Sequence, residues 1–119
     1  MPITMQHERD NIYRMDVSGV LSKADLDQSQ DWLIAAMKRT GSARLLIVLA
    51  GFKGWEANPN WGDLTFYVKH GDSIEKIAIA GDERWRSEAL MFASADLRRA
   101  PVEFFPENRL ADARAWLSR

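Results

Sequence analysis

Side chains that could carry out catalysis are few in this sequence, and none has the spacing of a known catalytic motif. The two histidines, His7 and His70, are far apart and fit no metal-ligand spacing. The chain has no cysteine and no serine in a Gly-x-Ser-x-Gly elbow, so thiolate chemistry and disulfides are excluded. Asp72, Asp82 and Glu83 have the positions of turn and cap residues. We therefore expect a non-enzymatic protein without a metal or cofactor, and an enzyme of unknown class is the least favoured alternative.

The stretch GFKGWEANPNW, residues 51–61, contains residues that could bind an apolar ligand. Trp55 and Trp61 flank an Asn-Pro-Asn turn, and Trp85 follows a later apolar segment. If these rings gather at the carboxyl end of an α/β sheet, where such sheets bind ligands, they form an apolar mouth. The alternative is that they fill the core. The glycines lack the spacing and the Lys-Ser/Thr pair of a nucleotide phosphate loop.

Further residues could complete such a ligand site. Phe66 and Phe92 would add apolar contact, and Lys69 or His70 would orient a polar end of the ligand. At the end of a helix, these two cations could equally complement the helix dipole. The segment EALMFASADL, residues 88–97, has apolar residues on more than one face of the expected helix. This pattern indicates either deep burial or a helix that covers a groove, a partner or a membrane surface. The candidate ligand-binding residues are Trp55, Trp61, Phe66, Lys69, His70, Trp85 and Phe92.

Length and charge favour one soluble domain spanning residues 1–119. Sixteen basic and seventeen acidic residues give a net charge of -1 without a block of either sign, so nucleic acid is not an expected partner. The first residues lack the pattern of a signal peptide, and the longest aliphatic run, Leu45 to Ala50, is too short to span a bilayer. We expect a cytoplasmic protein, with peripheral association at the inner face of the membrane left open.

Strand-like and helix-like segments alternate along the chain in the order β-β-α-β-α-β-α-β-α. The order predicts an α/β fold with a mixed, mostly parallel sheet of about five strands and about four helices. Period-two alternation around Tyr13, Met15 and Val17 predicts a hairpin, and Ser22 and Gly41 are the expected caps of the first helix. The expected strands are 3–8, 12–20, 43–50, 75–81 and 101–105, and the expected helices are 23–39, 58–71, 83–97 and 107–119.

Two segments carry a family resemblance. GWEANPNWGDLTFYVKHGDSIEKIAIAGDERW, residues 54–85, and VEFFPENRLADARAWL, residues 102–117, make the chain resemble the SpoIIAA-like branch of the STAS domains. The order of elements agrees over nearly the full length. The resemblance implies a small single domain whose best-known relatives are anti-sigma-factor antagonists. Other members of this branch are thought to bind apolar or lipid-like ligands or to associate with membranes.

The resemblance also supplies an alternative function. In the antagonists, a serine at the start of the helix after the central strand is phosphorylated by a partner kinase, which changes the local charge and the docking surface. The matching positions here, residues 55–58, carry no hydroxyl. We therefore favour a module that binds an apolar or amphiphilic small molecule or a membrane surface. The alternative is an antagonist-type protein-interaction regulator without the phosphoacceptor serine. A homodimer, for example through the first strand, is a weaker expectation.

Overall fold

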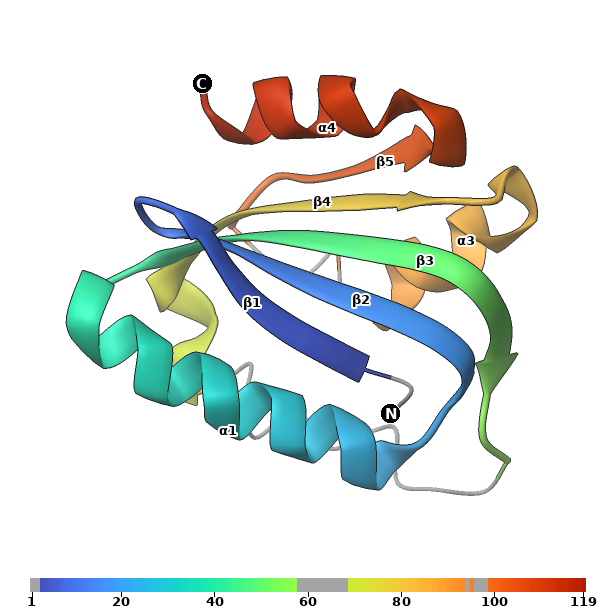
Figure 1. Ribbon diagram of the computed structural model, residues 1–119, viewed down its shortest axis with the longest axis horizontal. Helices are drawn as coiled ribbons and strands as arrows, with labels where there is room; N and C mark the ends of the chain where they lie inside the picture. The colour runs from blue at the N-terminus through green and yellow to red at the C-terminus, as the bar shows by residue number, and fades with distance from the viewer. Residues whose placement is uncertain (1–2, 58–68, 94, 96–98) are drawn as a thin grey trace.

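The computed structural model describes residues 3–57, 69–93, 95 and 99–119. These residues form a five-stranded sheet in the order β1-β2-β3-β4-β5, with helices on both faces (Figure 1). The strands are β1 (Ile3–Arg9), β2 (Ile12–Leu21), β3 (Ala43–Trp55), β4 (Ile74–Gly81) and β5 (Val102–Pro106). The α-helices are α1 (Lys23–Thr40), α3 (Arg86–Phe92) and α4 (Leu110–Leu117), and the 3-10 turns are η1 (Gly71–Ser73), η2 (Glu83–Trp85) and η3 (Glu107–Arg109).

The sheet is mixed and mostly parallel, as the sequence predicts. β1 pairs antiparallel with β2, and every later neighbouring pair is parallel. The carboxyl ends of β2, β3, β4 and β5 therefore lie along one edge of the sheet, on the right in Figure 1. We call this the carboxyl edge. β1 is an edge strand, and the homodimer expected there stays a prediction.

The predicted hairpin and first helix are confirmed. Tyr13, Met15 and Val17 are buried on one face of β2, so the period-two pattern does set which face is covered. Ser22 caps α1 by accepting a hydrogen bond from the backbone N–H of Asp25 at 3.1 Å. At the other end Gly41 has φ 80 and donates its N–H to a carbonyl of the last turn, a conformation that glycine adopts without the strain of a side chain.

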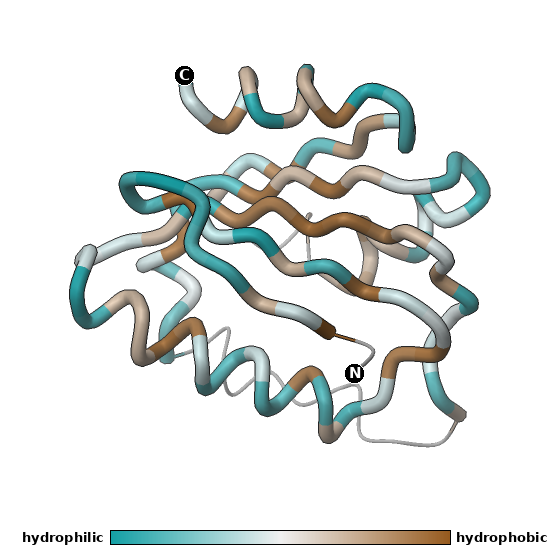
Figure 2. Tube along the Cα trace, viewed as in Figure 1, coloured by the Kyte–Doolittle hydropathy of each residue, from teal (hydrophilic) through white to brown (hydrophobic). Residues whose placement is uncertain are grey.

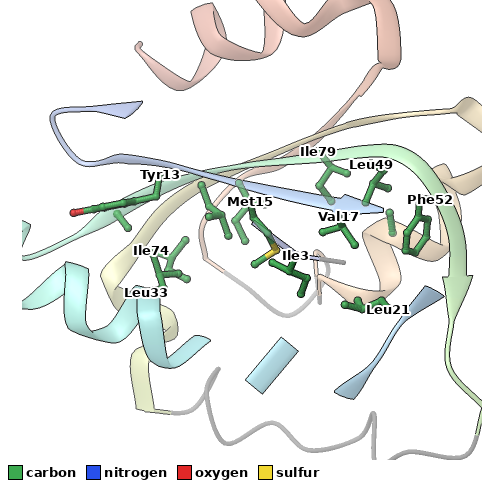
Figure 3. Close-up of a cluster of buried hydrophobic side chains, with 14 of the residues drawn as sticks. Ile3, Tyr13, Met15, Val17, Leu21, Leu33, Leu49, Phe52, Ile74 and Ile79 are labelled. Carbon is green, nitrogen blue, oxygen red and sulfur yellow. The ribbon is translucent and has the colours of Figure 1, made fainter. Parts of the chain in front are cut away.

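β3 is covered on both faces, as its continuous apolar sequence predicts. On one face Leu45 and Leu49 belong to a large core beneath α1 and α3, part of which is drawn in Figure 3. On the other face Leu46 and Val48 pack against Ala113 and the rest of α4. The hydrophobic stretch along β3 is visible at the centre of Figure 2. β3 is thus the central strand of the sheet and contributes to the core on both faces.

β3 continues to Trp55, beyond residue 50, where the sequence predicts that the strand ends. After bulges in the ladder, Phe52 pairs with Gly19 and Trp55 pairs with Leu21 of β2. The positive φ values of Gly51 (68) and Gly54 (116) allow the backbone to bend while the pairing resumes. In Figure 1 the end of β3 curves strongly away from the line of the sheet.

The later helices differ in their bounds from the prediction. The third helix, expected over 83–97, starts as the 3-10 turn η2, and the α-helical part covers only Arg86–Phe92. Asp82 caps this turn as expected by accepting from the Arg84 N–H at 3.0 Å. The last helix likewise begins with a 3-10 turn, over Glu107–Arg109. Most of the expected helix 58–71 lies outside the described residues, which begin again at position 69.

Ion pairs attach α4 to the hairpin. Arg114 donates to both carboxylate oxygens of Glu8, at 2.9 and 3.2 Å, and Arg14 lies 3.8 Å from the same carboxylate. The hydrogen bond from Arg114 is the main reason that the pKa of Glu8 is below its ordinary value. At the carboxyl end of α4, Arg44 and Lys76 donate to backbone carbonyls, which is the favourable placement for cations.

Candidate functional site

Four aromatic side chains meet at the carboxyl edge of the sheet. Phe52 lies edge-on to Trp55 and to Trp85, with ring centroids 4.9 and 5.0 Å apart. Trp55 and Trp85 are 5.8 Å apart at 77°, and Phe92 lies 5.4 Å from Trp55. We call Phe52, Trp55, Trp85 and Phe92 the aromatic cluster. Edge-to-face contacts at these distances are attractive in addition to the burial of apolar surface.

The bend of β3 positions the cluster. Phe52 and Trp55 come from the curved end of that strand, Trp85 ends η2 just after β4, and Phe92 ends α3. A Cβ on Gly54 would lie 3.6 Å from Cη2 of Trp85, an ordinary van der Waals distance, so the indole ring lies beside this residue. The absence of a side chain at Gly54 thus permits the positive φ of the bend, while Trp85 leaves room for a Cβ at an ordinary van der Waals distance.

The cluster reaches from the core to the surface. Phe52 is 4% exposed and belongs to the large core, next to Leu49 in Figure 3. Trp55, Trp85 and Phe92 are only partly buried and pack against that core. The inner ring is therefore part of the core, and the outer three rings pack against it and border solvent. An apolar mouth at this place stays a prediction.

Trp55 carries a buried polar atom without a partner. Its indole Nε1 is shielded from solvent, and it is the one such buried side-chain nitrogen or oxygen without a hydrogen bond among the described residues. Buried donors in proteins are nearly always hydrogen-bonded, so this exception calls for an explanation. The indole N–H can act only as a donor.

The charges beside the cluster are largely neutralised within η2 and α3. Arg86 donates to both carboxylate oxygens of Glu83, at 2.6 and 3.1 Å, which lowers the pKa of Glu83 and raises that of Arg86. The guanidinium of Arg86 also lies over the ring of Phe104, 4.9 Å from its centroid. The guanidinium of Arg84 lies 4.9 Å from the Trp85 ring centroid, a cation–π contact on the solvent side of the cluster.

Glu56 is a neighbouring polar residue that sequence reasoning did not select. Its carboxylate accepts a hydrogen bond from the backbone N–H of Lys23 at 2.9 Å, and its own N–H donates to the carbonyl of Leu21. The end of β3 is thereby joined to the start of α1. The two partners are 33 positions apart, so no local sequence pattern could have indicated the contact.

The structure brings together three of the seven candidate residues. Trp55, Trp85 and Phe92 meet in the aromatic cluster, with Phe52 added to them. Trp61 and Phe66 lie outside the described residues.

Lys69 and His70 are not brought to the cluster. They directly precede η1, which leads into the amino end of β4, whereas Trp85 follows the carboxyl end of that strand. The eight residues of β4 separate the two ends by roughly 25 Å at the usual rise of a strand. The expectation that Lys69 or His70 orients the polar end of a ligand bound by Trp85 is therefore not supported by their place in the fold.

Searches for other kinds of site give two negative findings. Within residues 3–57, 69–93, 95 and 99–119, no group of three or more His, Cys, Asp or Glu side chains could hold a metal ion. Over the same ranges, the helices are too short or too polar to cross a membrane.

Comparisons with known proteins agree with the architecture. The profile of the SpoIIAA-like family matches residues 12–118. A similar solved structure is that of an uncharacterized protein of the DUF3478 family with a SpoIIAA-like fold from Shewanella loihica PV-4. It is 24% identical, with a TM-score of 0.71 over 97% of this chain and 91% of that chain, and this likeness shows the fold. A search of curated proteins finds no match. Since the family profile covers β2 to β5 and every described α-helix, the chain belongs to the SpoIIAA-like family.

Proposed function

We propose that this protein is a non-enzymatic SpoIIAA-like module that binds an apolar or amphiphilic small molecule at the carboxyl edge of its sheet. The observation that carries the proposal is the aromatic cluster, in which three partly exposed rings extend the core to the surface. Aromatic rings of this kind offer a large apolar area with little conformational freedom to lose, which favours ligand contact. The carboxyl edge of a parallel sheet is also where α/β folds usually bind ligands.

Exposed apolar side chains near the cluster support contact with lipid. Met91 is 76% exposed and directly precedes Phe92, and Val20 is 51% exposed and pairs with Gly54. An exposed methionine is a flexible apolar contact that adapts to different surfaces. These residues favour an amphiphile or a lipid surface over a polar metabolite as the source of the ligand.

The described part of the phosphoacceptor region does not favour the antagonist-type switch. Trp55, Glu56 and Ala57 have no hydroxyl to phosphorylate, and the Glu56 carboxylate already binds the start of α1. A phosphate at such a site acts by accepting new hydrogen bonds from nearby donors. Here the Glu56 carboxylate already accepts from one such donor, the backbone N–H of Lys23.

Native mass spectrometry and organic extraction of the freshly purified protein test the proposal. We expect a co-purifying amphiphile with the wild-type chain and its loss with Trp85→Ala, which removes one outer ring of the cluster. Trp116→Ala is the matched control because Trp116 packs on the opposite face of the sheet, against Phe105. Repeated recovery of empty wild-type protein, together with no binding of added fatty acid or liposomes, would contradict the proposal.

A further inference from the structure

The buried N–H of Trp55 specifies the chemistry of the ligand, if the proposed function holds. We infer that the ligand carries a carbonyl or carboxylate oxygen that accepts a hydrogen bond from Trp55 Nε1, while its hydrocarbon part contacts the rings of the aromatic cluster. The proposed function asks only for an apolar or amphiphilic molecule. This inference adds that a pure hydrocarbon is not the ligand. The acceptor oxygen bound by Trp55 Nε1 distinguishes the expected ligand from a hydrocarbon.

Among the described residues, the rings around Trp55 offer its N–H no side-chain acceptor. The neighbouring rings are Phe52, Trp85 and Phe92, and neither phenylalanine nor tryptophan has a side-chain oxygen or nitrogen that accepts a hydrogen bond. An N–H directed at an aromatic face is only a weak substitute. A buried donor left unpaired costs free energy that an incoming acceptor recovers, so the apo protein favours ligands with an oxygen at this place.

α3 contributes one ring to the surroundings of Trp55. Phe92, which lies 5.4 Å from Trp55, is its last residue, and Ala89 is the one buried residue of this seven-residue helix. Leu90 and Phe92 of the same helix are partly buried and pack against the core.

The nearby charges are compatible with two head groups. Glu83 and Arg86 neutralise each other, Asp82 binds the backbone of η2, and Arg84 places one cation over Trp85. A carboxylate would be attracted to Arg84, whereas an ester carbonyl needs only the Trp55 N–H. Both share the acceptor oxygen, and comparison of an acid with its ester separates their contributions.

The experiment uses three probes of one chain length, namely dodecanoic acid, methyl dodecanoate and dodecane, each delivered from cyclodextrin to the ¹⁵N-labelled full chain. The five tryptophans give five indole N–H signals, and Trp→Phe variants assign them. We expect the acid and the ester to move the Trp55 indole proton to higher frequency, as a new hydrogen bond does, and dodecane to leave it in place. Titration yields the affinity for each probe.

Trp55→Phe removes the donor and keeps an aromatic ring. For the wild type we expect the ester to bind about tenfold more tightly than dodecane, the usual size of one buried hydrogen bond, and we expect this ratio to fall to about one in Trp55→Phe. Trp116→Phe, on the opposite face, should retain the wild-type ratio. If Trp55→Phe does not fold, the wild-type indole shifts and the wild-type ratio of affinities still decide the question.

The outcomes separate this inference from the proposed function. Equal binding of all three probes, or an unmoved Trp55 signal when the ester is bound, overturns the inference while the apolar ligand site stands. Retention of the tenfold ratio in Trp55→Phe also overturns it. Failure of the wild type to bind any probe, with no co-purifying amphiphile, overturns both.

Discussion

The indole ring of Trp85 lies beside Gly54, with its Cη2 atom at a van der Waals distance of 3.6 Å from the place that a Cβ would occupy. Gly54 has φ 116, a conformation that strains every residue with a side chain. We expect Gly54→Ala to lower the free energy of unfolding by about 1–3 kcal/mol, the usual cost of such strain. Urea unfolding followed by tryptophan fluorescence measures it.

The control for this prediction is Gly19→Asn. Gly19 has φ 63 with open space around it, a conformation that asparagine tolerates better than most residues. Gly19→Asn should therefore cost clearly less than Gly54→Ala. Equal losses would show that the backbone strain at Gly54 is not the cause.

The contact between Glu56 and the start of α1 leads to a second prediction. The carboxylate accepts from the Lys23 N–H, one of the backbone donors that a helix leaves unpaired at its first turn. We expect Glu56→Ala to destabilise the fold by about 1 kcal/mol, the usual value for loss of a cap, and Glu56→Gln to lose less because its amide oxygen can still accept. Chemical denaturation of the variants provides the measurement. Glu107→Ala removes an exposed carboxylate elsewhere and should change little; a neutral Glu56→Ala would contradict the prediction.

The sheet and the first helix could be predicted because their signals are local. Alternation around Met15 marks a half-covered strand, and the caps Ser22 and Gly41 mark where α1 begins and ends. The bend of β3 was missed because glycines at positions 51 and 54 are typical of loops. The sequence offers only the apolar Phe52 followed by the charged Lys53 as a signal for a continuing strand, and the structure buries the first and exposes the second.

The site was only partly predictable, because its members meet through tertiary contacts. The position of Trp85 after an apolar strand correctly indicated the same edge as Trp55. By contrast, Lys69 and His70 precede β4 and Trp85 follows it, so the length of that strand separates these two residues from Trp85. The Nε1 of Trp55 is buried by tertiary packing, in a cluster whose rings come from different elements, so no local pattern in the chain could reveal it.

The pair of Glu8 and Arg114 predicts how stability depends on pH. The hydrogen bond from Arg114 lowers the pKa of Glu8 in the folded state, relative to the ordinary value of 4.5 that applies when the chain unfolds. The contribution of the pair is therefore fully present above about pH 5 and is lost as the pH falls through the folded pKa. Glu8→Gln cannot titrate at this position.

Urea unfolding of the wild type and Glu8→Gln at about pH 7 and about pH 3 measures how the contribution of the Glu8–Arg114 pair to the free energy of unfolding depends on pH. A carboxylate with a lowered pKa is protonated only in acid. We expect Glu8→Gln to be less stable than the wild type at the higher pH and the difference to shrink at the lower one. Glu75 and Glu83 also have lowered pKa values. Both proteins contain these two residues, so their contributions cancel when the free energies of unfolding of the wild type and Glu8→Gln are subtracted. A difference independent of pH would show that Arg114 does not act through the ionised form of Glu8.

The exposed side chain of Met91 makes the lipid contact testable without disturbing the core. At 76% exposure, Met91 contributes little to packing, so Met91→Glu should leave the free energy of unfolding within about 0.5 kcal/mol of the wild type. On a lipid surface the same change replaces an apolar contact by a charge that resists desolvation, and we expect reduced sedimentation with phosphatidylcholine vesicles. Ser87→Glu is the matched control, because it adds the same charge at an exposed position of α3 without removing an apolar side chain. If both variants lose vesicle binding equally, charge on α3 accounts for the effect; if neither loses it, Met91 is not part of the lipid contact.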